Sequence, residues 1–284
     1  MRLFLLTALT MIAFAANSLL NRMALVGGGM DAVSFGTLRL VAGAVMLAVL
    51  CMALRGGLRL GHAGQSVGVA ALLLYIYGFS AAYDALDAGL GALILFGMVQ
   101  ITMFMGALAA REVLPPRRWI GAGVSFAGLV WLLWPGAGAQ TVSLWHGASM
   151  AAAGVGWGIY SLMGRGASDG LSVTAANFAL AAPVGVLLWL VAPGDTIWDG
   201  QGVVLAVLSG AVASGLGYAL WYALLPRLQA SVAAVAQLSV PVIAIAGGMV
   251  LLAEAPSLRI VLAGALVLGG VALSVGGRVR VTRS

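Results

Sequence analysis

The sequence has few charged residues for its length. Only 8% of its 284 residues are charged, whereas 62% are apolar. A soluble domain usually carries charge on about a quarter of its residues, which form a hydrated shell. Because that shell is missing here, we expect lipid rather than water to surround most of the surface.

Lysine is absent, and cysteine occurs once, at Cys51. Without lysine there is no GxxxxGK[ST] phosphate-binding loop, which excludes an ATPase motor of that kind. A single cysteine excludes an internal disulfide and any CxxC metal or redox site. We therefore predict no cofactor and no bound metal, and any pumping must draw on a gradient or a partner.

The net charge of +6 comes from 14 basic residues, all of them arginine. They are scattered between apolar runs and form no basic stripe, which argues against a nucleic-acid partner. The partners that remain are the lipid bilayer and a small-molecule solute. A monomer is sufficient for this role, and the sequence leaves the oligomeric state open.

Apolar runs long enough to cross a bilayer repeat along the chain. A spanning helix needs roughly 20 mainly apolar residues. Ten such runs are predicted, at 3–26, 32–54, 67–84, 88–110, 117–135, 144–164, 172–192, 201–223, 229–252 and 257–276. The sequence thus predicts an all-α integral membrane protein with ten transmembrane helices.

The first run has an alternative interpretation as a cleavable signal peptide. Arg2, the apolar residues after it and Ala13-Phe14-Ala15 imitate such a leader. The apolar stretch continues to Val26, however, and it has a counterpart later in the chain. We therefore interpret it as a transmembrane helix.

Arginine placement predicts the orientation, because cytoplasmic loops of membrane proteins are enriched in Lys and Arg. With both termini cytoplasmic, all arginines except Arg22, Arg39 and Arg259 fall on the inner side. Most acids fall outside: Asp31, Asp84, Asp87, Asp195, Asp199 and Glu254, against Glu112 and Asp169 inside. We expect a multi-pass protein of a bacterial inner membrane.

The two halves of the chain repeat at an offset of half its length. Ala110 and Glu112 align approximately with Ala253 and Glu254, and Ser18-Leu19 aligns with Ser161-Leu162. We predict two five-helix units, residues 1–142 and 143–284. Since five is odd, the second unit must be inverted in the membrane, an arrangement typical of secondary transporters. The alternative is a duplication that only builds a large membrane protein.

Two motifs resemble those of a known superfamily. The first resembles the closing motif of EamA-type drug/metabolite (DMT) transporters and consists of Pro241, Glu254, Pro256, Gly264 and Gly269-Gly270. The second resembles the same motif in the first half and consists of Glu112-Val-Leu-Pro with Gly121 and Gly128. Arg39 also fits the family pattern, whereas Val99 stands where the family has a proline. The resemblance covers the whole chain and implies a ten-helix transporter. Size and aromatic-lined helices are also similar to YddG-type exporters of aromatic amino acids and methionine.

Polar and aromatic residues near the middle of the predicted helices are candidates for solute contact. They are Asn17, Tyr75, Phe79, Tyr83, Gln100, Trp157, Tyr160, Tyr218, Trp221, Tyr222 and Gln237. The alternatives are packing between helices and, for the two glutamines, an interhelical hydrogen bond. Six other tryptophans fall near helix ends, where an aromatic belt is expected.

Four further residues have positions that suggest roles. Pro241 removes a backbone hydrogen bond inside a predicted helix, so it is a candidate kink or hinge. Arg39, about seven residues into its helix, could bind a solute carboxylate, pair with an acid or extend its side chain outward. Glu112 and Glu254 occupy corresponding helix ends, which favours structural bonds over chemistry.

All the acids fall near predicted helix ends, so no carboxylate is available for proton exchange at the midplane. A neutral cavity lined by aromatic and amide groups suits zwitterionic or neutral amphiphiles, such as large amino acids. Export, by alternating access, is implied only by the resemblance. Alternatives are another solute class (sugar phosphate, nucleotide sugar or drug), a channel, or a membrane-embedded enzyme, for which no catalytic set is evident.

Overall fold

The computed structural model describes residues 1–26, 29–112, 114–134, 143–164, 167, 169–192, 198–228, 233 and 236–275. In these ranges the regular structure is helical, apart from one isolated bridge between Met30 and Trp198. Six helices are long and apolar enough to cross a membrane, and two more apolar helices are shorter. The chain is a multi-pass membrane protein.

The first half contains five helices. They are α1 (Arg2–Leu25), α2 (Ala32–Arg55), α3 (Gln65–Tyr83), α4 (Ala88–Ala109) and α5 (Pro116–Leu133). The sequence predicted each of these bounds to within a few residues.

The described part of the second half is also helical. It contains α6 (Leu144–Gly164), α7 (Gly170–Val191), a continuous span from Gly200 to Arg227, α11 (Ser239–Leu251) and α12 (Leu258–Val275). The helix predicted at 229–252 is described only from Ser239 onward as a regular element, and much of 229–235 lies outside the described residues. Asp195, Arg165, Arg278, Arg280 and Arg283, which entered the orientation argument, also lie outside them.

The span from Gly200 to Arg227 changes its helical type midway. It runs from α8 (Gly200–Val207) through the π-helix η1 (Leu208–Leu216) to α9 (Gly217–Leu224) and ends in the 3-10 turn η2 (Leu225–Arg227). Most π-helical segments are single turns and often occur at functional sites. This one is nine residues long. Its buried face consists of Ser209, Gly210, Ala213, Ser214 and Gly215, whereas Leu208, Val212 and Leu216 are exposed.

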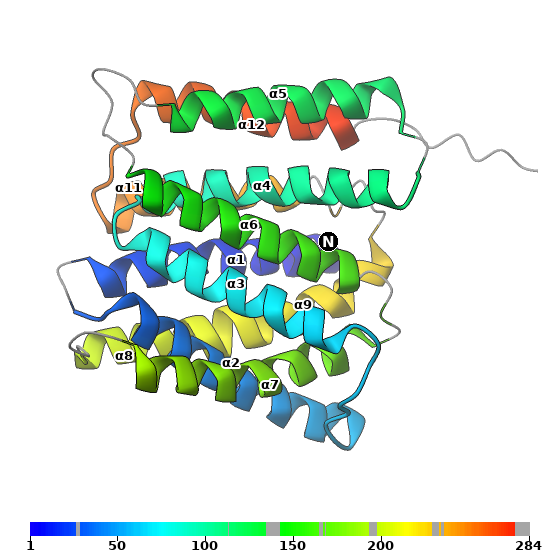
Figure 1. Ribbon diagram of the computed structural model, residues 1–284, viewed down its shortest axis with the longest axis vertical. Coiled ribbons are helices and arrows are strands. Elements are labelled where there is room, and N and C mark those ends of the chain that lie inside the picture. Colours follow the sequence, from blue (N-terminus) through cyan, green and yellow to red (C-terminus); the bar gives the residue numbers. More distant parts are fainter. Residues whose placement is uncertain are drawn as a thin grey trace, which may run out of the picture.

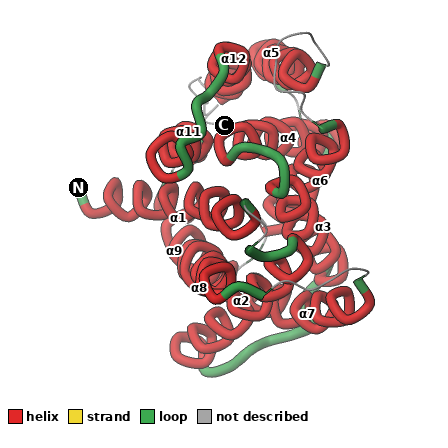
Figure 2. The backbone as a smooth tube through the Cα atoms, turned by 90° about the vertical axis from the view of Figure 1, so that its left-hand side faces the viewer, coloured by secondary structure: helices red, strands yellow, loops and turns green. Residues whose placement is uncertain are grey.

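The helices run side by side in layers, with α5 and α12 forming the outermost layer at one edge and α2 and α7 lying toward the opposite edge (Figures 1 and 2). Helix α2 packs on α7, and α5 packs on α12. Helix α6 packs between α3 and α4, while α1 packs against the span Gly200–Arg227 and α11. The core therefore lies where α1, α3, α4, α6 and that span approach one another.

Small residues allow this close approach, since helices in lipid associate mainly by packing. A Cβ atom on Gly156 of α6 would lie 2.7 Å from the Ala71 carbonyl oxygen and 2.8 Å from the Tyr75 nitrogen, both on the backbone of α3. Gly156 thus sets the separation of α3 and α6 at the level of the core.

The exposed tryptophans agree with a lipid-facing surface. Trp119, Trp131, Trp134, Trp145 and Trp198 are exposed near helix ends, whereas Trp157 and Trp221 are buried. The sequence had left Trp221 ambiguous between belt and interior, and the structure places it inside.

Candidate solute-binding site

A cluster of aromatic rings occupies the interior between the two halves of the chain. Trp157 of α6 lies at its centre, with ring centroids 5.0 Å from Tyr75 of α3 and 5.0 Å from Tyr218 of α9. Phe14 of α1 makes edge contacts with Trp157 and Tyr218, at 6.3 and 5.7 Å. Such edge-to-face and offset geometries are the favoured ones for aromatic pairs.

A narrow cavity of about 10 Å³, roughly the room that one water molecule needs, lies among these rings. Its lining consists of Phe14, Asn17, Ser18, Tyr75, Phe79, Leu95, Phe96, Trp157 and Tyr218. None of these nine side chains carries a charge. The cavity is apolar with a few polar groups, as small-molecule sites usually are.

The rings leave little free width in this state. Trp157 also stacks on Tyr160 at 5.6 Å, with an interplanar angle of 17°. Phe79 contacts Tyr75 and Tyr83 along one face of α3, at 5.4 and 4.7 Å. A solute as large as an aromatic amino acid could enter only if the rings moved apart, so this arrangement is a closed one.

One side of the cavity is polar and links α1 to the π-helix. Asn17 Oδ1 accepts hydrogen bonds from Ser209 Oγ at 2.7 Å and from Ser214 Oγ at 3.3 Å. The two serines are five residues apart, which would separate them by about 140° around an ordinary α-helix. The i→i+5 pattern of a π-helix brings them to the same face. The unusual backbone thus positions both hydroxyls at Asn17.

Arg39 of α2 is completely buried directly behind this wall. Its Nε donates to Ser214 Oγ at 3.2 Å and its Nη2 donates to the Tyr75 hydroxyl at 2.8 Å. The guanidinium also lies over the rings of Tyr75 and Phe79, 5.1 and 5.0 Å from their centroids. Its side chain neither extends outward nor pairs with an acid of the described chain, two of the roles that the sequence had left open.

A second group of polar side chains lies beside the aromatic cluster. Tyr160 OH, Thr174 Oγ1 and Asn177 Oδ1 are buried close together, yet none makes a hydrogen bond of ordinary geometry in the described structure. Tyr222 packs against the backbone near Gly164 and Gly170 beside them. Trp221 contacts Phe14 with ring centroids 5.8 Å apart but does not line the cavity.

The remaining candidates lie elsewhere. Gln100 and Gln237 are half-buried and do not line the cavity. Pro241 is the third residue of α11, just after a turn at Leu238. Its missing N–H therefore falls in the first turn, where a helix has no bond to lose.

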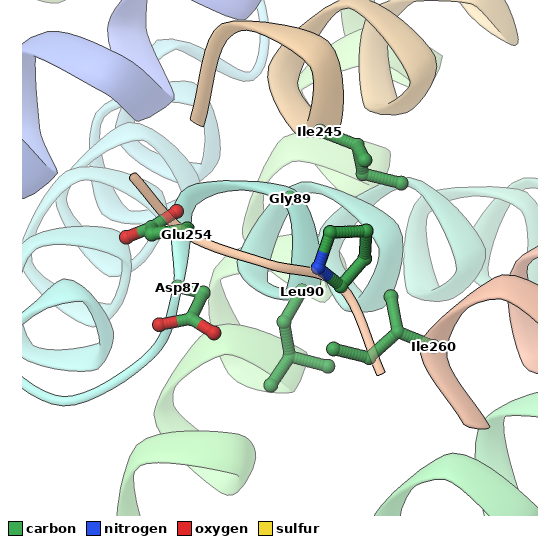
Figure 3. A pocket seen from close by; sticks show the side chains of 7 residues that line it. Asp87, Gly89, Leu90, Ile245, Glu254 and Ile260 are labelled. Atoms are coloured by element: carbon green, nitrogen blue, oxygen red, sulfur yellow. The ribbon is translucent and has the colours of Figure 1, made fainter. Parts of the chain in front are cut away.

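An ion network closes one end of the bundle. Arg22 Nε lies 3.1 Å from Glu254 Oε1, and Arg22 Nη2 lies 3.7 Å from Asp87 Oδ1. Glu254 Oε2 also accepts from the Ala88 N–H at 2.8 Å. Figure 3 shows the two carboxylates together beside an apolar pocket formed by Leu90, Ile245 and Ile260. Burial raises the pKa of Glu254, although the bonds from Ala88 and Arg22 act in the opposite direction.

Two ion pairs lie outside the core. Glu112 is exposed and lies 3.5 Å from Arg118. Asp169, at the start of α7, pairs with Arg55 at 2.7 Å and accepts from the Ser172 N–H. Burial alone would raise the pKa of Asp169, but the bonds from Arg55 and Ser172 outweigh it and the pKa lies below its usual value.

Several lining residues were not recognised from the sequence. Phe14 belonged to a segment that imitates a signal peptide. Ser209 and Ser214, which bond Asn17 beside the cavity, were not among the predicted candidates. Ser18, Leu95 and Phe96 carried no signal that separates cavity lining from ordinary packing. A pair of hydroxyls five residues apart, opposite a buried amide, is the one pattern that could have been noticed.

Comparison with known proteins assigns the family. Residues 145–276 match the model of the EamA-like transporter family. A protein of Pseudomonas aeruginosa described as "Uncharacterized protein PA1977" is 47% identical over 277 residues, covering 98% of this chain and 96% of that protein. The chain is therefore of the same family as that Pseudomonas protein, and its residues 145–276 form an EamA-like transporter domain.

This domain suggests a membrane transporter of the DMT superfamily, as the resemblance to that superfamily implied. A solved structure described as "Crystal structure of protein" aligns with a TM-score of 0.66 over 96% of each chain. Its sequence identity is 20%, so that match shows the fold alone.

Proposed function

We propose that this EamA-like protein moves a zwitterionic or neutral amphiphilic metabolite, such as a large amino acid, through the cavity around Trp157. The observation that carries the proposal is the lining itself. Helices from both halves contribute rings and amide or hydroxyl groups, and no acid is among the lining side chains. Rings can stack on a flat apolar side chain while Asn17 and the hydroxyls bind its polar end.

The proposal includes an inverted pair of five-helix units, residues 1–142 and 143–284. Corresponding backbone features support it: Arg111 and Ala253 both have positive φ angles, 55° and 54°. Asp31 and Asp169 both cap the helix that follows, each accepting from a serine N–H three residues on. The pairings α2 with α7 and α5 with α12 are those that a two-fold axis between the units would produce.

Alternating access around such an axis would expose the cavity to each side in turn. In the described state the Arg22–Glu254 network closes the end that we assign to the outside, with both termini cytoplasmic in a bacterial inner membrane. The turn at Leu238, before Pro241, is a candidate hinge. The likeness to aromatic amino-acid exporters suggests export as the direction.

The test is counterflow in proteoliposomes. Vesicles with the purified full chain are preloaded with an unlabelled amino acid, and uptake of labelled L-phenylalanine or L-methionine is followed. We expect transient accumulation that Trp157→Ala reduces at least tenfold. Trp145→Ala, on the exposed surface, is the matched control and should leave flux unchanged.

Counterflow with sugar phosphates but with no amino acid would overturn the choice of substrate. Equal effects of Trp157→Ala and Trp145→Ala, in variants of equal stability, would overturn the choice of site. Uptake that does not saturate and shows no counterflow would indicate a channel.

A further inference from the structure

The guanidinium of Arg39 has a hydrogen-bonding group without a partner. Nε and Nη2 are bonded to Ser214 and Tyr75, but Nη1 is buried and makes no hydrogen bond within the described residues. A buried unpaired donor is costly, and more so on a charged group. A fully buried cation with one free donor is therefore an incomplete site.

The Tyr218 hydroxyl lies in the same place. It is buried and close to the guanidinium, yet it makes no hydrogen bond of ordinary geometry. The Tyr75 hydroxyl accepts from Arg39 Nη2 and also interacts with the Tyr218 hydroxyl. Two groups without a hydrogen bond of ordinary geometry, Arg39 Nη1 and the Tyr218 hydroxyl, thus lie together beside the Tyr75 hydroxyl.

These donors belong to the edge of the aromatic cavity. Tyr75 and Tyr218 both line it, and the ring of Trp157 lies 5.0 Å from each of theirs. None of the ion pairs of the described chain includes Arg39, so its charge has no anion of the protein's own within reach. The group that would complete the site is an anion that enters from the cavity.

We propose that Arg39, Tyr75 and Tyr218 form a carboxylate-binding subsite at the edge of the cavity. A solute would place its carboxylate oxygens on these donors and its apolar part among Trp157, Phe14 and Phe79. The planar fork of an arginine matches a carboxylate better than other side-chain cations do. The inference rests on the proposed function and narrows its substrates to solutes that carry a carboxylate.

The first test compares ligand pairs that differ only in the carboxylate. Binding to the purified full chain is measured by thermal shift and calorimetry with 3-phenylpropionate and its amide, and with L-phenylalanine and its amide. We expect each acid to bind at least tenfold more tightly than its amide, as a charge-assisted hydrogen bond implies. Equal binding of acid and amide would overturn the proposal.

The second test removes the donors. Arg39→Gln should abolish the preference for the acid, and Arg39→Lys should retain only part of it, because lysine lacks the fork. Tyr218→Phe removes one hydroxyl and should lower the preference about tenfold. Tyr77→Phe is the matched control, since the Tyr77 hydroxyl bonds Thr37 instead. If Arg39→Gln does not fold, Tyr218→Phe decides, and an unchanged preference there would overturn the proposal.

A chloride arm distinguishes a bound inorganic anion from a solute carboxylate. Binding is repeated at low and at high chloride concentration, with no other small anion added. If chloride alone stabilises the protein through Arg39 while the organic acids do not, the subsite is an inorganic anion site and the proposal fails. If the acids bind preferentially but no counterflow occurs, the transport proposal fails and the subsite stands. If counterflow occurs without preferential binding of the acids, the subsite fails and the transport proposal stands.

Discussion

Asn17 accepts hydrogen bonds from two serines that belong to one helix and thereby joins α1 to the π-helix η1. Its neighbour one turn along, Asn21, donates a single bond to Ser80 at 3.0 Å and does not line the cavity. Both amides are almost completely buried. Substituting each of them in turn therefore separates the energy of the hydrogen bonds from the effect of solute contact.

We expect Asn17→Ala to lower the free energy of unfolding by about 1 kcal/mol, since an interhelical bond in a bilayer averages roughly 0.6 kcal/mol. Asn21→Ala should cost about half as much. Only Asn17→Ala should also reduce flux, because only Asn17 contacts the cavity. Thermal unfolding and counterflow measure the two effects, and equal flux losses in the two variants would contradict the assignment.

Residue roles were only partly predictable from the sequence. Polar and aromatic groups at mid-membrane depth are costly unless they are used or paired. For that reason the sequence identified Asn17, Tyr75, Phe79, Trp157 and Tyr218. Phe14 could not be recognised, since a phenylalanine in an apolar helix looks the same whether it faces lipid or a cavity. The partners of Arg39 were also hidden, because they come from α3 and from the distant span Gly200–Arg227.

At the scale of elements, the separation of α3 and α6 depends on Gly156. Gly156→Ala would place a methyl group against two backbone atoms of α3, which cannot rotate away. Overpacking of this kind typically costs about 1–3 kcal/mol. It should also separate Tyr75 from Trp157 and lower flux.

Gly123→Ala is the control for Gly156→Ala. Nothing lies within 4 Å of its Cβ position, so alanine there should be neutral or stabilising by up to about 1 kcal/mol. Thermal unfolding in one detergent compares the two. A destabilised Gly123→Ala with an unaffected Gly156→Ala would show that the helix separation is set elsewhere.

The start of α7 allows an ion pair to be separated from a helix cap. Asp169→Asn removes the charge that pairs with Arg55 but keeps a good cap, so it should cost no more than about 0.5 kcal/mol at a pair this exposed. Asp169→Ala removes both and should cost about 1 kcal/mol more.

The pH dependence of Asp169 has a defined sign. Its pKa is lower in the folded protein, so its contribution is complete above the unfolded pKa of about 4. That contribution is lost as the pH falls through the folded pKa. The stability difference between the wild type and Asp169→Asn should therefore shrink on acidification, as thermal unfolding against pH would show. A difference that grows would contradict the pairing.

Helix positions were predictable from the sequence because a bilayer fixes the length of an apolar run. The π-helix was not, since Leu208–Leu216 contains only small and apolar residues that suit an α-helix equally well. Its backbone is a response to Asn17 and to close packing with α2, and those contacts are formed only in the folded bundle.

At the scale of the whole molecule, the proposed orientation places consecutive connections on opposite sides of the membrane. The connection between α2 and α3 and the start of α6 lie at opposite ends of the bundle (Figure 1). Leu60 in that connection and Leu144, the first residue of α6, are both exposed. Each can carry a single engineered cysteine once the buried Cys51 is replaced by alanine.

An impermeant thiol reagent applied to intact cells should label Leu144→Cys and leave Leu60→Cys unlabelled until the cells are opened. The reason is that the Arg-rich connections belong inside. If both cysteines are labelled from outside, the proposed topology is wrong. If only Leu60→Cys is labelled from outside, the protein has the opposite orientation in the membrane.

The burial of Arg39 also has an electrical consequence. A charge fixed about 10 Å along α2 from its first residue stands within the dielectric barrier, where a potential of 100 mV acts on each elementary charge with about 2.3 kcal/mol. If water reaches that charge from each side in turn, the empty protein carries a positive charge through part of the field. An anion bound to Arg39 would cancel that charge. The membrane potential should therefore change the rate at which the empty protein reorients more than the rate at which the loaded protein reorients.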